Sequence, residues 1–291
     1  MNTRGLFGRS FYLVLALVLL TALFLSACSS NTTSTVPPAT TLKAASPTVV
    51  TPLYGGTLTI GMNRDAVFLG DPIELTQQQD TVMSRPAVET LARYDTSGKL
   101  IPVLATSWEM NSTALTMTIT LRKGVKFHDG TDFNATAVKF NLDRFTASKR
   151  SELTQVKSVD VVDDYTVRLN LKTWDNTIDG AALYYAGNMI SPLAFQTNGK
   201  AWIEKNPVGT GPFKFVSWER DVSLVYQKNT NYWQPGKPYL DKIQFRVIAD
   251  PMVSLAALER REIDIQEFTD SKDLATLKAT GKYTINKSKQ T

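Results

Sequence analysis

Residues 115–121 alternate between large apolar side chains and threonine, and this pattern limits the possible folds more than any other stretch of the chain. Apolar side chains at every second position lie on one face of a β-strand, so the segment predicts a half-buried strand. Asp129-Gly130 then predicts a turn, and Asn134 or a neighbour predicts the start of a helix. The apolar residues that follow share one helical face: Ala135, Val138, Leu142 and Phe145. The chain therefore combines half-buried strands with amphipathic helices.

More strands and one more helix are expected along the rest of the chain. The expected strands cover residues 55–61, 159–162, 165–171, 213–218, 222–226 and 243–248. The second and third of these flank Asp163-Asp164 and predict a β-hairpin. Pro251 predicts the first turn of a helix that continues to about Arg260, because a missing N–H costs nothing at that position. Strands and helices are interspersed without strict alternation, which predicts a mixed α/β or α+β fold.

The first 28 residues predict export from the cytoplasm. Arg4 and Arg9 form a basic start without acids, and residues 11–25 are almost entirely apolar. This apolar run fits a secretory signal better than a membrane span, which needs about 20 residues. Leu25-Ser26-Ala27-Cys28 resembles the bacterial lipobox, in which the cysteine is lipidated and becomes the mature N-terminus. The alternative is an ordinary signal peptide with an incidental cysteine. We therefore expect a signal peptide over residues 1–27 and a lipid anchor on Cys28.

Residues 28–53 predict a flexible tether. Of these 26 residues, 15 are Ser, Thr or Pro, so the segment cannot bury enough apolar surface to offset its ordering entropy. A lipidated cysteine carries enough acyl chains for stable attachment. The expected location of the body is the outer face of the cell membrane, on its periplasmic side where there is one.

Composition excludes several classes of site. The chain has one cysteine and one histidine, which rules out an internal disulfide framework and a Cys/His zinc site. Its net charge of +5 falls to 5 − 2 = +3 without Arg4 and Arg9, and there is no long basic run. Such a charge does not indicate nucleic-acid binding. No cofactor and no bound metal are expected.

Eight short motifs, each weak alone, occur in order along residues 54–291. They are 89–95 (ETLARYD), 100–108 (LIPVLATSW), 121–131 (LRKGVKFHDGT), 161–167 (VVDDYTV), 206–213 (NPVGTGPF), 232–233 (YW), 238–243 (PYLDKI), and 257–258 (AL) followed by 262–264 (EID). Together they resemble the bacterial extracellular solute-binding proteins of family 5, the oligopeptide-, dipeptide- and nickel-binding receptors of ABC importers.

This resemblance implies a periplasmic-binding-protein-like fold of type II, in which two lobes close over a solute. Residues 54–84 and 184–291 would form the N-terminal part of lobe I, with a small inserted domain over 85–183. The chain then stops before the second lobe, so a truncated receptor is expected. The implied partners are a small solute, an oligopeptide or a dipeptide, and the permease subunits of an ABC importer. No catalytic residue is implied.

The resemblance also implies ligand contacts. In the peptide receptors, residues after the first strand and its Asp-Pro, here Asp71-Pro72, form part of the pocket wall. The matching positions are Thr76, Gln77 and Gln78, whose side chains both donate and accept hydrogen bonds. A second contact stretch follows the Glu-Ile-Asp element, at Glu267 and Phe268. The alternative is that these residues form ordinary surface loops.

Two alternative functions compete with this prediction. Asp129, Asp132, Glu262 and Asp264 could supply paired carboxylates to a secreted hydrolase, although turn and helix-exit positions explain them equally well. The chain could also be a truncated lipoprotein that binds nothing. His128 belongs to the motif at 121–131 and is expected to be structural.

Two further positions carry structural expectations. Gly209-Thr210-Gly211-Pro212 lacks the residues of a phosphate-binding loop and predicts a fixed bend. Arg261 stands where the family usually has glycine before Glu-Ile-Asp. If that position is a left-handed helix cap, arginine there costs about 1 kcal/mol relative to glycine.

Overall fold

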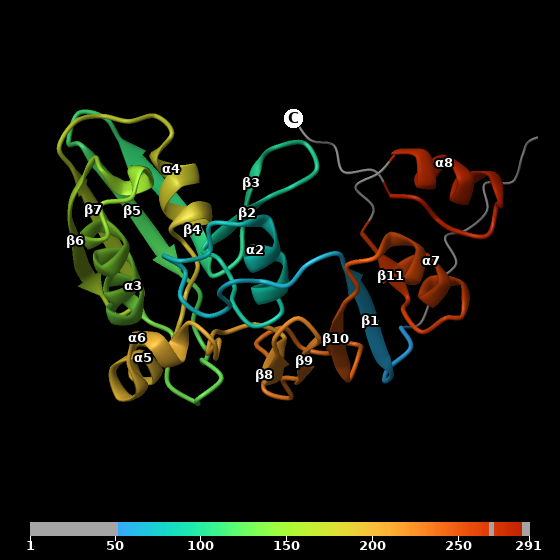
Figure 1. The fold of residues 1–291 in the computed structure, drawn as a ribbon. Helices are drawn as coiled ribbons and strands as arrows, with labels where there is room; N and C mark the ends of the chain where they lie inside the picture. The colour runs from blue at the N-terminus through green and yellow to red at the C-terminus, as the bar shows by residue number, and fades with distance from the viewer. Residues whose placement is uncertain (1–51, 268–270, 287–291) are drawn as a thin grey trace, which may run out of the picture. The chain divides into compact units, whose positions relative to one another are not determined.

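A five-stranded mixed sheet contains the first and last strands of the described part of the chain. The computed structural model describes residues 52–267 and 271–286. In strand order the sheet consists of β11 (Ile265–Gln266), β1 (Thr57–Met62), β10 (Lys242–Val247), β9 (Ser223–Lys228) and β8 (Phe213–Glu219). β1 lies parallel to both of its neighbours, whereas β8, β9 and β10 form an antiparallel meander. Helix α7 (Pro251–Glu259) connects β10 to β11 (Figure 1). The strands and the helix expected here are all confirmed.

A four-stranded antiparallel sheet contains the alternating segment. Its strands, in order, are β4 (Ala105–Asn111), β5 (Thr116–Leu121), β7 (Thr166–Leu171) and β6 (Val156–Asp163). The apolar residues of β5 are buried as predicted, namely Met117, Ile119 and Leu121. The predicted hairpin is present as β6 and β7. Alternation therefore identified both the strand and the face that it buries.

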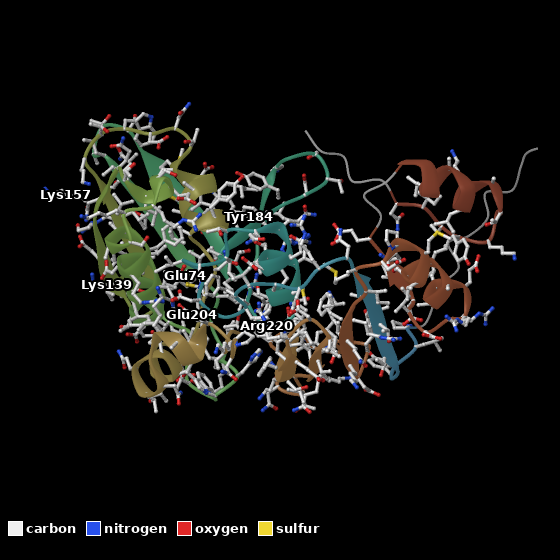
Figure 2. All side chains as sticks on the ribbon, viewed as in Figure 1. Glu74, Lys139, Lys157, Tyr184, Glu204 and Arg220 are labelled. Atoms are coloured by element: carbon white, nitrogen blue, oxygen red, sulfur yellow. The ribbon has the colours of Figure 1, made fainter. Side chains whose placement is uncertain are left out.

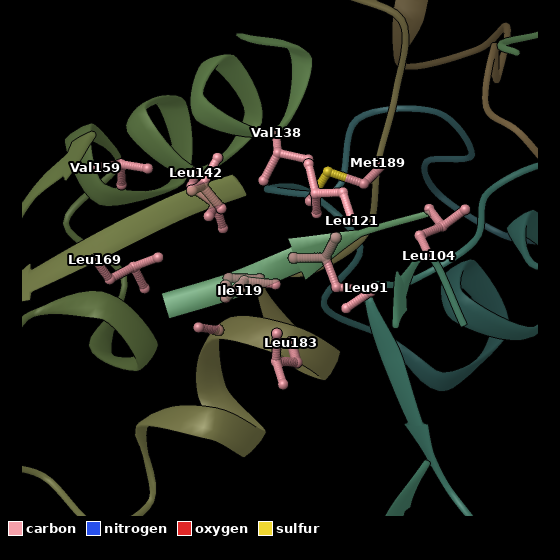
Figure 3. Packing of buried hydrophobic residues seen from close by; sticks show 14 of the residues in the cluster. Leu91, Leu104, Ile119, Leu121, Val138, Leu142, Val159, Leu169, Leu183 and Met189 are labelled. Atoms are coloured by element: carbon pink, nitrogen blue, oxygen red, sulfur yellow. The ribbon is translucent and has the colours of Figure 1, made fainter. Parts of the chain in front are cut away.

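Helix α3 (Ala135–Ala147) packs against β6 and β7. Asn134 caps it as predicted, because its side-chain oxygen accepts a hydrogen bond from the backbone N–H of Ala137 at 3.0 Å. Figure 3 shows Val138 and Leu142 of this helix facing Ile119 of the sheet. The four apolar residues predicted to share one helical face are all buried.

Short elements complete the described part of the chain. They are α2 (Gln78–Ser84), β2 (Ala92–Tyr94), β3 (Leu100–Pro102), η1 (Ser151–Leu153), α4 (Ile178–Gly180), the π-helical turn η2 (Ala181–Tyr185), α5 (Pro192–Asn198), α6 (Lys200–Ile203) and α8 (Ser271–Ala279). β2 and β3 form a separate antiparallel pair. Within the described ranges, no helix combines the length and apolar character that crossing a membrane requires.

The buried apolar side chains form two separate cores. One core covers the four-stranded sheet with α3 and η2, and the other covers the five-stranded sheet with α2, α5 and α6. The chain passes between them in two antiparallel segments that contact each other. The backbone N–H of Met189 donates to the carbonyl of Glu89 at 3.0 Å, and that of Leu91 donates to Gly187 at 2.9 Å. These two segments lie beside the candidate site.

Candidate functional site

A cavity of about 170 Å³ lies where α2, η2 and the start of η1 approach one another. Its lining combines apolar side chains with a few charged and hydroxyl groups, the usual character of a site for a small molecule. The lining residues are Pro72, Leu75, Thr81, Arg85, Thr90, Arg150, Glu152, Tyr184, Tyr185 and Asn188. Thr90 and Asn188 belong to the two segments that connect the cores.

Two arginines hold one wall of the cavity in place: Arg144 in α3 and Arg150, which follows that helix. Asp71 forms a 2.7 Å ion pair with Arg144 and fixes the turn that contains Pro72. Arg150 donates from Nη1 to the carbonyl of Ile73 at 2.8 Å. Helix α2 begins seven residues after Asp71, and its Thr81 lies one turn before Arg85. The wall is therefore fixed by contacts with residues about 75 positions further along the chain.

The opposite wall is the π-helical turn η2, which carries Tyr184 and Tyr185 (Figure 2 labels Tyr184). Such turns are rare and often occur at functional sites. The two rings pack edge to face with centroids 5.1 Å apart, and Tyr94 packs against Tyr184 at the same distance. Arg85 donates from Nη2 to the hydroxyl of Tyr184 at 2.6 Å. Tyr185 is exposed, so an aromatic surface remains open beside the cavity.

The charged groups of the cavity sum to +1. Arg150 and Glu152 form an ion pair with a 2.5 Å separation, which cancels their charges. Burial alone would raise the pKa of Glu152, but hydrogen bonds from Arg150, the backbone and Ser151 outweigh it and lower that pKa. Arg85 forms no ion pair with any residue in the described part of the chain. One unbalanced guanidinium therefore faces the site.

Those of the predicted ligand-contact residues that the structure describes are not part of the lining of this cavity. Thr76, Gln77 and Gln78 are exposed, and Gln77 precedes the first turn of α2. Gln78 donates from Nε2 to Oε1 of Glu267 at 3.0 Å. The structure thus brings together two predicted positions that are 189 residues apart. Phe268 and Cys28 lie outside the described residues.

The four carboxylates that could have served a hydrolase are each engaged in a structural contact. Asp129 accepts hydrogen bonds from Thr131 and Ser191, and Asp264 accepts one from the backbone N–H of Thr59. Asp132 pairs with Lys126, and Glu262 pairs with Arg246 and Arg260. In the residues that the structure describes, no three metal-ligating side chains cluster.

His128 occupies a buried position next to the Gly209–Pro212 bend. Its Nε2 donates to the carbonyl of Gly211 at 2.9 Å, and burial lowers its pKa to about 4. The bend itself lies against the backbone of Pro86 and Ala87, because Gly211 N–H donates to the Ala87 carbonyl at 2.9 Å. A Cβ at Gly209 would overlap that same carbonyl oxygen. The two glycines therefore permit close backbone packing.

Most of the cavity lining was missed by sequence reasoning. Arg85, Arg150, Glu152, Tyr184 and Tyr185 belong to no motif with a chemical signature. The adjacent tyrosines were the one available signal, because exposed aromatic pairs mark binding surfaces. Their position opposite Arg85 arises only from tertiary structure.

The comparison with known proteins identifies the class. The profile described as "Bacterial extracellular solute-binding proteins, family 5 Middle" matches residues 99–291. The glutathione-binding protein GsiB of Pectobacterium atrosepticum is 38% identical over 197 residues, which are 66% of this chain and 38% of that protein.

Two solved structures show the same fold. DppA from Helicobacter pylori, in complex with the peptide STSA, matches with a TM-score of 0.70 and 28% identity, over 78% of this chain and 49% of that one. AppA from Bacillus subtilis, in complex with a nonapeptide, matches with a TM-score of 0.67 and 28% identity, over 73% and 44%. The fold is that of the periplasmic binding proteins, as predicted.

The chain belongs to the bacterial extracellular solute-binding proteins of family 5. It spans less than half of the length of each of the relatives named above. Because this is a family of binding proteins, the assignment confirms the expectation that the chain is not an enzyme.

Proposed function

We propose that the chain contributes the N-terminal part of the solute receptor of an ABC importer, and that the cavity beside η2 holds a carboxylate-bearing solute of the short-peptide class. The observation that carries this proposal is the unbalanced Arg85 guanidinium between the cavity and the Tyr184 hydroxyl. A guanidinium held in this way offers its remaining N–H groups to a carboxylate.

The charge of the cavity also supports a peptide-like solute. Its sum of +1 complements a ligand with one net negative charge, and the Arg150–Glu152 pair offers a carboxylate to a ligand amino group. Glutathione, which the relative from Pectobacterium is named for binding, has two carboxylates and one ammonium group. The tyrosines would cover the apolar part of such a ligand.

The residues predicted from the family resemblance would extend this site. Gln78 and Glu267 are hydrogen-bonded to each other and lie at the ends of α2 and β11. We propose that Thr76, Gln77, Gln78, Glu267 and Phe268 contact the part of the solute that projects from the cavity. Exposed glutamines suit backbone amides because they donate and accept hydrogen bonds.

The proposal also covers the targeting segments and the domain organisation of the protein. Residues 1–27 act as a signal peptide, Cys28 carries lipid, and residues 28–53 tether the body outside the membrane, where it delivers solute to permease subunits. Residues 85–183 form a domain inserted between 54–84 and 184–291. The two cores support this boundary. The buried residues of the core around the four-stranded sheet all come from 91–189, whereas those of the core around the five-stranded sheet come mainly from the flanking segments.

Calorimetry with glutathione and with short peptides tests the solute proposal. We expect Arg85→Ala to weaken binding at least tenfold, and Arg93→Ala to leave it within twofold, because Arg93 is exposed on β2 and does not line the cavity. Equal effects of the two variants, or absence of binding to any peptide, would contradict the proposal and favour the non-binding lipoprotein.

A separate experiment tests the anchor. Changing Cys28→Ser should release the processed chain from membranes or block its processing. Unchanged membrane retention and mass would contradict lipidation without affecting the solute proposal.

A further inference from the structure

A second hollow, of about 540 Å³, lies on the surface around Arg122, Lys123, Trp233 and Lys237. It shares no lining residue with the solute cavity. Its charged lining is entirely cationic, with three positive side chains and no carboxylate. Within the described part of the chain, none of the three cations forms an ion pair, whereas the nearby Lys126 is paired with Asp132. The charge of the hollow is therefore unbalanced at its surface.

Arg122 is held in place for binding by contacts that leave the end of its side chain free. Its Nε donates to the carbonyl of Val103 at 2.8 Å, and its guanidinium lies 4.4 Å from the centre of the Trp233 ring. Its two Nη atoms have no hydrogen-bond partner among the residues that the structure describes. A guanidinium fixed in this way loses little entropy when it binds an oxyanion.

A hydrogen bond to Glu89 holds the Trp233 ring in place. Its Nε1 donates to Oε2 of Glu89 at 3.0 Å, and the Glu89 carboxylate also accepts hydrogen bonds from Tyr232 and Thr210. This network keeps the indole ring under Arg122. If the Glu89 carboxylate is counted as ionised, the net charge of the three cations and this carboxylate is 3 − 1 = +2.

The two lysines complete the cationic lining. Lys237 donates from Nζ to the Gln234 side chain at 2.9 Å, and Lys123 is exposed with its ammonium 5.2 Å from the Tyr165 ring. A sum of +2 matches a phosphate group, which carries nearly two negative charges at neutral pH. A single carboxylate would leave the hollow cationic.

We infer that this hollow is a binding site for a phosphate-type oxyanion, separate from the solute cavity. The phosphate can come from a free phosphate compound or from the headgroup of an anionic lipid at the membrane surface. In both cases Arg122 binds two phosphate oxygens and the lysines add attraction; a phosphate monoester carries nearly two negative charges, whereas a lipid phosphodiester carries one. Binding should weaken as salt is added, because the lysines are exposed and screened.

The test uses two probes with the full chain. Pyrophosphate is titrated in calorimetry at low ionic strength, and vesicles of phosphatidylglycerol or of phosphatidylcholine are used in co-sedimentation. The vesicle arm uses the Cys28→Ser chain so that a lipid anchor cannot contribute. The site variant is Lys123→Gln/Lys237→Gln, which removes two charges without disturbing Arg122 or Trp233. The matched control is Lys157→Gln/Lys205→Gln, which removes two exposed charges that do not line the hollow and that, like the two site lysines, form no ion pair within the described residues.

We expect the site variant to lose at least tenfold in affinity and the control variant less than twofold. A loss confined to pyrophosphate identifies a free phosphate compound as the ligand, and a loss confined to phosphatidylglycerol vesicles identifies lipid. Equal losses in both variants, or no binding of either probe, would overturn the inference. Peptide binding by the same variants should be unchanged, so failure here is separable from failure of the solute proposal.

Discussion

Arg144 and Asp71 form an ion pair of 2.7 Å in which the aspartate is completely buried and the arginine side chain is 17% exposed. The pair joins the last turn of α3 to the turn that precedes α2, and the Arg144 guanidinium also lies 3.8 Å from the centre of the Phe195 ring. The ion pair therefore connects the wall of the solute cavity that contains Pro72 to α3, which belongs to the core of the four-stranded sheet.

Removing the carboxylate should destabilise the protein strongly. We expect Asp71→Ala to lower the free energy of unfolding by about 3 kcal/mol, because it leaves a largely buried guanidinium without its counter-ion. Asp143→Ala is the control, since the Lys139–Asp143 pair is 40% and 46% exposed and contributes at most about 0.5 kcal/mol. Urea unfolding measures both values. Similar losses in the two variants would show that burial does not govern this pair.

The bend at Gly209 should tolerate no side chain. A Cβ there would overlap the Ala87 carbonyl oxygen and push apart two segments that pack backbone to backbone. We expect Gly209→Ala to cost about 3 kcal/mol. Gly98→Ala serves as control, because an added Cβ meets nothing within 4 Å there and only the positive φ of 81° opposes it. That variant should cost about 1 kcal/mol. Thermal or urea unfolding that ranks the two equally would contradict the packing role.

His128 should make the protein less stable in mild acid. Its pKa is about 4 in the folded chain, lowered by burial, against 6.5 when unfolded. Its neutral form therefore contributes stability that is fully present above pH 6.5 and is lost as the pH falls toward 4. Between pH 7 and pH 5 the loss should be about 2 kcal/mol.

The comparison variant for this pH effect is His128→Gln, in which the corresponding part of the pH dependence should disappear. Burial raises the pKa of Glu89, so that group favours folding below its unfolded pKa of 4.5 and opposes it as the pH rises. Glu89 thus acts in the opposite direction and cannot produce the predicted loss. Identical pH dependence of unfolding in the wild type and the variant would contradict the role of His128.

The regular elements could be predicted from sequence because their periods are visible in single segments. The alternation at 115–121 and the apolar face from Ala135 to Phe145 specified both the type of element and its buried side. The predicted contact stretches at Gln78 and Glu267 came from the family resemblance, and their hydrogen bond shows that they are neighbours. Their role in binding stays a prediction.

The solute cavity could not be predicted in the same way. Arg85, Arg150 and Tyr184 come from three segments, and no spacing rule relates positions that only tertiary packing brings together. The ion pair between Asp71 and Arg144 is a further example, because each residue alone occupies an unremarkable turn or helix position.

The departure from the family's usual glycine at Arg261 was visible in the sequence, and the structure shows the backbone conformation of this residue. Arg261 follows α7 with a φ of 59°, in the left-handed region. Its N–H donates to the carbonyl of Leu258 at 3.1 Å, and the N–H of Glu262 donates to Ala257 at 2.8 Å. This pair of bonds defines a Schellman cap, whose left-handed position favours glycine. The expectation of a left-handed cap is confirmed.

Replacing this arginine should stabilise the protein. Arg261→Gly removes the Cβ strain of the left-handed conformation, so we expect the free energy of unfolding to rise by about 1 kcal/mol. The matched control is Arg260→Gly, at the preceding position, where φ is −81° and the backbone is right-handed. There the same change adds backbone freedom to the unfolded chain and removes the exposed Arg260–Glu262 ion pair, so stability should fall by about 0.5–1 kcal/mol. Opposite signs in urea unfolding would establish that backbone conformation decides the effect, whereas a loss in both variants would show that the Arg261 side chain contributes more than its strain costs.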